Sequence, residues 1–150
     1  VSPGQRVYAR QLNCEGNARG DNNKEGFVRN LGGLFWVLGY KTEHGATVLR
    51  TTSGGRSEIL GGLWYPAQGV GDTSIPAIAV ENASLLASFT DIAYFDRTAY
   101  KIVVEETQDG TTKTLPRGSI PITWGAGHYA VPLYRSGDDE QEDVIDAQAQ

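Results

Sequence analysis

The feature of this 150-residue chain that most constrains its fold is an internal repeat. Residues 32–39 (GGLFWVLG) and 54–61 (GGRSEILG) share the pattern GG-xxx-(V/I)-L-G at an offset of 22 residues. A short predicted strand precedes each copy, Phe27–Asn30 in one and Thr47–Thr51 in the other. Such a repeat predicts a β-solenoid, in which each strand pairs in parallel with its equivalent one coil away, at a spacing of ~4.8 Å. In that register Val37 lies above Ile59.

The rest of the chain also reads as short strands, and helical periodicity is nearly absent. Asp109-Gly110 is a hairpin signal, because both residues readily take the positive φ values of a type I′ turn. An all-β chain is therefore expected. Its strands are predicted at Arg6–Leu12, Phe27–Asn30, Leu34–Thr42, Thr47–Thr51, Ser57–Leu60, Leu63–Tyr65, Ala77–Val80, Leu85–Phe89, Ile92–Tyr94, Lys101–Thr107 and Thr111–Leu115.

The repeat also predicts how the chain is organised. Residues 1–136 are expected to form a parallel β-helix segment of about three to four coils, with loop insertions at 13–25 and 67–75. The glycine pairs are expected at corners where the backbone needs positive φ. Asn82-Ala83 stands where a third, degenerate copy would have its glycine pair. An antiparallel sandwich of glycine-cornered hairpins would produce a similar strand spacing and stays open as an alternative.

Three segments resemble the C-terminal coils of bacterial pectate-lyase-superfamily proteins: YARQLN at 8–13, GGLFWVLGYKTE at 32–43 and GGLWYP at 61–66. The resemblance extends over roughly residues 7–115 and implies a right-handed parallel β-helix. It also implies a secreted or cell-surface protein that binds or acts on polysaccharide, of which this chain is a segment. No position matches a catalytic motif of that superfamily, so we expect scaffolding and binding from this chain and assign no catalytic residue.

Charge is distributed unevenly along the chain. The net charge is −5, but six acidic residues lie in the last thirteen, so the rest of the chain is close to +1. Without a dense basic patch, nucleic acid is not an expected partner. No apolar run is long enough to span a membrane. The acidic tail, residues 137–150, is expected to be disordered or bound to a partner and to add nothing to the core.

Aromatic residues on neighbouring coils form the candidate site. In the 22-residue register Trp36 stacks on Glu58, which suits an outward position, since a buried, unpaired Glu58 would be costly. Outward aromatic rings can stack on the apolar faces of sugars. The predicted glycan-binding residues are Trp36, Tyr40, Lys41, Arg50, Glu58, Trp64 and Tyr65. The alternative is that these aromatics pack beneath the chain's own loops.

Two further function classes remain open at this stage. One is a structural β-solenoid module that assembles into a larger extracellular complex through its open edge or its tail. The other is a free-standing carbohydrate-binding module.

Other candidate groups are weaker. His44 and His128 are too far apart in sequence to indicate a metal site. A calcium loop could draw on oxygen-bearing residues but lacks the usual acidic pattern. Cys14 has no adjacent base to activate it. Nothing selects a catalytic pair among the available carboxylates. The residues concerned are Asn17, Asp21, Asn22 and Asn23 for the loop, and Glu43, Glu58, Glu81 and Asp91 for the carboxylates. No metal or other cofactor is expected.

Overall fold

The structure is a computed structural model that describes residues 1–14, 25–43, 45–64, 75–92, 100–120 and 128–136. The described residues form ten strands and one short 3-10 turn, η2, at Arg117–Ser119. The strands are β1 Arg6–Asn13, β2 Val28–Leu31, β3 Leu34–Thr42, β4 Leu49–Thr52, β5 Arg56–Trp64, β6 Ile78–Glu81, β7 Ser84–Ile92, β8 Ile102–Gln108, β9 Thr111–Pro116 and β10 His128–Arg135. The expectation of an all-β chain is confirmed.

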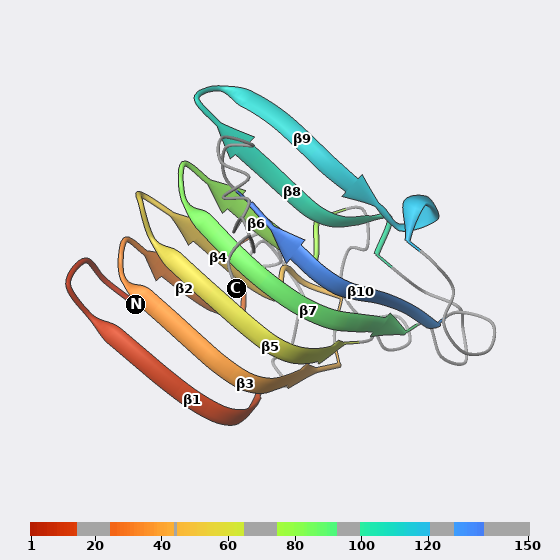
Figure 1. The fold of residues 1–150 in the computed structure, drawn as a ribbon, viewed down its shortest axis with the longest axis horizontal. Coiled ribbons are helices and arrows are strands. Elements are labelled where there is room, and N and C mark those ends of the chain that lie inside the picture. The colour runs from red at the N-terminus through yellow and green to blue at the C-terminus, as the bar shows by residue number, and fades with distance from the viewer. Residues whose placement is uncertain (15–24, 44, 65–74, 93–99, 121–127, 137–150) are drawn as a thin grey trace, which may run out of the picture.

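From β1 to β8 the strands alternate between two sheets that are mostly parallel (Figure 1). The first sheet, called sheet A here, has the order β1-β3-β5-β7-β10, and sheet B has the order β2-β4-β6-β8-β9. Only the last strand of each sheet is antiparallel to its neighbour: β10 to β7 and β9 to β8. Val37 pairs with Ile59 and Trp36 with Glu58 in parallel, as the repeat predicts. Parallel pairing also excludes the antiparallel sandwich.

Tight turns connect β2 to β3, β4 to β5 and β6 to β7, along one side of the molecule (Figure 1). Gly32 and Gly54 take positive φ values of 102° and 72°, and Asn82 takes 45° at the equivalent place in the third copy. The turns are tied to one another: the Arg56 and Ser84 amides donate to the carbonyls of Gly33 and Gly55, both at 2.9 Å. The corner role predicted for the glycine pairs, and for asparagine in the third copy, is confirmed.

A buried asparagine reinforces the first of these corners. The Asn30 side chain donates to the carbonyls of Gly33 and Arg56 and to the Ser57 hydroxyl, at 3.0–3.1 Å, and its oxygen accepts from the Gly33 amide at 2.9 Å. A buried amide is tolerated only when its polar atoms are paired. These bonds connect the turn to β5, so they hold neighbouring strands in register.

A column of bulges lies at the position of the repeat's last glycine. Gln11, Gly39 and Gly61 have φ values of 53°, 78° and 78°, and each sits between residues that pair in register with the next strand. An inserted residue with positive φ changes which side chains face inward beyond it. In β3, Val37 faces the core before the bulge and Tyr40 faces it after the bulge, while Leu38 remains 44% exposed.

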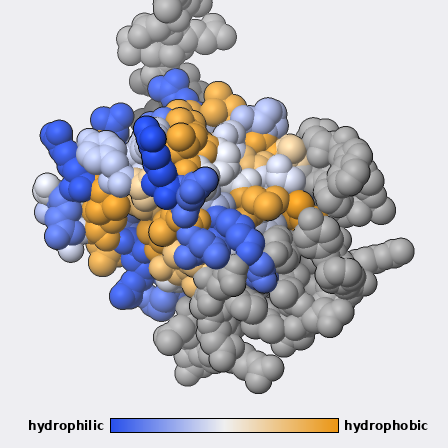
Figure 2. Space-filling model, turned by 90° about the horizontal axis from the view of Figure 1, so that it is seen from below, coloured by the Kyte–Doolittle hydropathy of each residue, from blue (hydrophilic) through white to orange (hydrophobic). Residues whose placement is uncertain are grey.

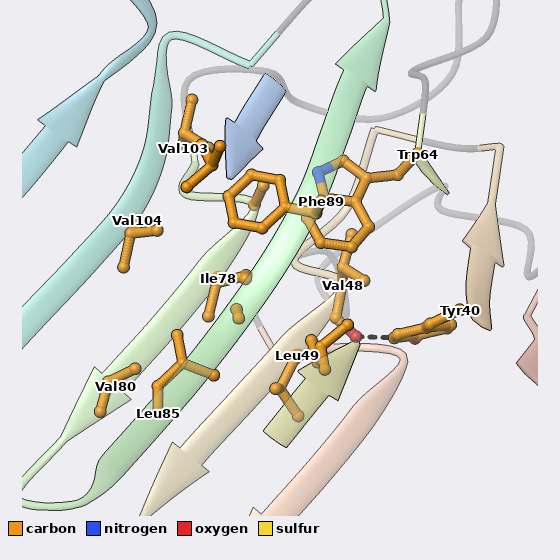
Figure 3. Packing of buried hydrophobic residues seen from close by; sticks show 14 of the residues in the cluster. Tyr40, Val48, Leu49, Trp64, Ile78, Val80, Leu85, Phe89, Val103 and Val104 are labelled. Carbon is orange, nitrogen blue, oxygen red and sulfur yellow. Dashed lines mark hydrogen bonds between the residues drawn. The ribbon is translucent and has the colours of Figure 1, made fainter. Parts of the chain in front are cut away.

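The core lies between the two sheets and contains side chains from both (Figure 3). Val37, Ile59 and Ala87 follow one another across sheet A, and all three are fully buried. Leu49 and Ile78 play the same part in sheet B. At these positions each side chain lies between inward apolar side chains of the neighbouring strands, so the stack buries a continuous apolar column.

Strand β10 does not appear among the strands predicted from the sequence. Pro132 interrupts its pattern, and a proline argues against a central strand. The structure places β10 at the edge of sheet A, with a shift in pairing between Val131 and Tyr134 on either side of that proline. An edge strand tolerates proline because one side needs no ladder hydrogen bonds.

Candidate functional site

The residues predicted to form a single glycan face are divided among three places. Trp36 and Glu58 lie half-buried on the outer face of sheet A. Lys41 also lies on sheet A and forms an ion pair with Glu43. Arg50 lies on sheet B, where it pairs with Glu81 at 3.2 Å. Tyr65 is outside the described residues.

Tyr40 and Trp64 are not surface residues, which corrects the sequence-based assignment. Their exposed fractions are 1% and 0%. The Trp64 ring stacks on Phe89 with centroids 4.5 Å apart, and the Tyr40 hydroxyl donates to the Val48 carbonyl at 2.9 Å (Figure 3). If side chains alternated regularly along β3 and β5, Tyr40 would face outward like Trp36, and Trp64 like Glu58. The bulges at Gly39 and Gly61 reverse the alternation. Neither ring can stack on a sugar.

A hollow of about 580 Å³ occupies the outer face of sheet A. Tyr8 and Trp36, from the paired strands β1 and β3, form its aromatic part, with ring centroids 6.5 Å apart. Leu34 and Leu86 add apolar surface. Its charged residues are Arg56, Glu58 and Arg135. Apolar walls with a few convergent polar groups are typical of a binding site for a small molecule or a chain of sugars.

Sequence reasoning found Trp36 and Glu58 but missed Tyr8, Arg56 and Arg135. Tyr8 lies outside the two clean copies of the repeat, yet it pairs directly with Trp36 and is 64% exposed. Arg56 stands two residues before Glu58, so the alternation of β5 could have identified it. Arg135 belongs to β10, which only the tertiary structure brings to this face.

The inner face of sheet A holds an unusual acid. Asp91 is 0% exposed and forms an ion pair with the Arg117 guanidinium. Burial raises the pKa of Asp91 to about 7, and the positive charge of Arg117 opposes that rise. Asp91 pairs in register with Trp64, and Trp64 with Thr42. All three carry a buried polar atom with no hydrogen-bond partner among the described residues: Thr42 Oγ1, Trp64 Nε1 and Asp91 Oδ1.

The part of the chain that the structure describes contains neither a metal-binding cluster nor a membrane-spanning helix. No group of three or more His, Cys, Asp or Glu side chains is placed to hold a metal ion there. None of its helical segments has the length and apolar character needed to cross a membrane. Cys14 is a half-buried free thiol beside the core. The calcium-loop residues 17–23 and His44 lie outside the described residues.

The fold and the hollow define an all-β protein with two facing, mostly parallel sheets and an aromatic site on the outside of one of them. No family model, no curated protein and no solved structure matches this chain. The resemblance to pectate-lyase-superfamily coils therefore stays a prediction from the residues.

Proposed function

We propose that this chain is a segment of a right-handed β-solenoid that binds polysaccharide on the outer face of sheet A. The solenoid is supported by the way equivalent strands stack: β1, β3, β5 and β7 pair in parallel in one sheet, and β2, β4, β6 and β8 in the other. One strand from each sheet, joined by a tight turn, makes one coil. The secreted or cell-surface location that the resemblance implies agrees with a polysaccharide ligand and is part of this proposal.

The observation that carries the proposal is the aromatic pair in the hollow. Tyr8 and Trp36 lie side by side on neighbouring strands and face outward. An outward-facing pair of rings of this kind offers apolar surface on which sugar rings can stack. Arg56 and Arg135 border the same hollow and can donate hydrogen bonds to hydroxyl or carboxylate oxygens.

The arrangement favours binding over cleavage. Glycoside hydrolysis generally uses two carboxyl groups flanking the bond that breaks. Among the described residues that line the hollow there is one carboxylate, Glu58. Asp91 lies on the inner face of the sheet with no exposed surface, so it cannot supply the second.

Replacing Trp36 with alanine should weaken polysaccharide binding about tenfold, or ~1.4 kcal/mol, because one of the two stacking rings is lost. We expect wild-type affinity of roughly 0.1–1 mM. Retardation in native gels that contain acidic polysaccharides (polygalacturonate, alginate) or neutral ones (dextran, β-glucan) measures this without relying on the deleted fluorophore. Leu63→Ala is the matched control, since Leu63 is exposed on sheet A but lies outside the hollow. Absence of retardation of the wild type by all four polymers contradicts the proposal.

The outer edge of β1, which pairs with no strand among the described residues, favours a second function, that of a structural module. β1 is the terminal strand of sheet A, and its inward residue Val7 is 37% exposed, whereas Phe35, its partner in β3, is 3% exposed. Seen from the β1 side, hydrophobic atoms lie open among hydrophilic ones (Figure 2). The neighbouring edge of β2 is covered by Val1, whose amino group donates to the Arg29 carbonyl and whose carbonyl accepts from the Leu31 amide.

Sedimentation velocity tests this second function. A module that assembles through β1 should self-associate at rising concentration, and Val7→Lys should abolish the association by placing a charge at the open end of the core. Leu133→Lys is the control, because Leu133 is 62% exposed on β10 at the opposite edge of the same sheet. A wild type that remains monomeric at all concentrations argues against assembly with itself.

A further inference from the structure

The outer face of sheet A is basic although the chain as a whole is acidic. Arg6 and Arg10 lie on β1 on the same face as Tyr8, because alternate residues of a strand share a face. Arg56 and Arg135 border the hollow itself. None of these four guanidinium groups forms an ion pair with another described residue. The hollow also contains one carboxylate, that of Glu58.

The described chain ends at this face. Arg135 and Ser136 both line the hollow. Ser136 is buried and anchored to the beginning of β7: its hydroxyl accepts from the Leu85 amide at 2.6 Å and its own amide donates to the Leu85 carbonyl at 2.9 Å. The next residues are 137–150, with six carboxylates and two adjacent apolar residues, Val144 and Ile145.

We propose that the acidic segment 137–150 binds across this arginine-bearing face and occupies the hollow. The proposal goes beyond polysaccharide binding, because it assigns the face an occupant from the chain itself. Charge complementarity selects that occupant: the segment is acidic, and the four arginines form no ion pair with another described residue.

Segment 137–150 is long enough to cross sheet A from β10 to β1. From β10 to β5 the distance across the sheet is two strand spacings, ~10 Å, which about three extended residues span. Asp138, Asp139 and Glu140 can therefore reach Arg56. From β10 to β1 the distance is ~19 Å, or about six residues, so the following acids can reach Arg6 and Arg10.

Paramagnetic NMR tests the proposal without any polysaccharide. A negative result would therefore count against docking of the acidic segment and not against polysaccharide binding. A nitroxide label is attached at Gln148→Cys in a Cys14→Ser background. We expect the amide signals of Tyr8, Arg10 and Trp36 to broaden several-fold more than those of Arg29 and Arg50 on sheet B. The difference should vanish in about 1 M NaCl, where the Debye length falls to about 3 Å.

Two full-length variants show whether charge is the cause. Neutralising the six tail acids to their amides should remove the selective broadening, and so should Arg56→Gln combined with Arg135→Gln. Arg29→Gln combined with Arg50→Gln, on sheet B, is the matched control and should leave it unchanged. Equal broadening of both sheets overturns the proposal, as does selective broadening elsewhere. Broadening that survives neutralisation of the tail also overturns it.

Discussion

Replacing Trp64 with alanine should lower the free energy of unfolding by about 3–5 kcal/mol. The indole has no exposed surface, stacks on Phe89 at 4.5 Å, and meets the Tyr40 ring edge-on at 6.4 Å. It also covers Gly62 so closely that a methyl group there would lie 2.2 Å from the indole. The parallel strands β3 and β7 on either side of β5 hold the Tyr40 and Phe89 rings in place, so the cavity left by the indole cannot easily collapse.

The adjacent residue provides the control. Leu63 is 38% exposed and points to the other side of β5. Leu63→Ala should change the free energy of unfolding by less than about 1 kcal/mol. Urea denaturation of the two variants beside the wild type measures both effects. Equal losses at the two positions would contradict the inward placement of Trp64 and, with it, the reversal of side-chain facing at the Gly61 bulge.

The stability of the folded chain should decrease as pH rises from about 4 to about 7, and Asp91→Asn should remove that decrease. Burial raises the pKa of Asp91 from 3.8 to about 7, against the opposing charge of Arg117. The folded protein then holds a proton that the unfolded chain releases, so the stabilisation is complete below about pH 4 and is lost by about pH 7. A difference of this size in pKa corresponds to roughly 4 kcal/mol.

An asparagine at position 91 mimics the protonated acid and cannot ionise. The variant should therefore match the wild type near pH 4 and exceed its stability at pH 8. Urea midpoints measured at several pH values give the comparison. Thr90→Ala, one residue along β7 on the outward side, should keep the wild-type pH dependence. A wild type whose stability rises over this range would show that the ion pair with Arg117 outweighs burial.

The sequence by itself determined the features that repeat along the chain. An offset of 22 residues is enough to predict that β3 and β5 pair in parallel with Val37 beside Ile59, because a stacked coil brings equivalent residues together. Glycine pairs and the asparagine that replaces one of them mark the corners, since few other residues take positive φ. The outward pairing of Trp36 with Glu58 follows from the same register.

Only the tertiary structure decided which side chains share the site. Alternation along a strand cannot show a bulge in advance, and the bulges at Gly39 and Gly61 turn Tyr40 and Trp64 from the surface into the core. Arg135 reaches the hollow because β10 pairs antiparallel with β7 as the last strand of sheet A, although Arg135 lies 79 residues along the chain from Arg56. Contacts between such distant segments depend on packing, which no local pattern encodes.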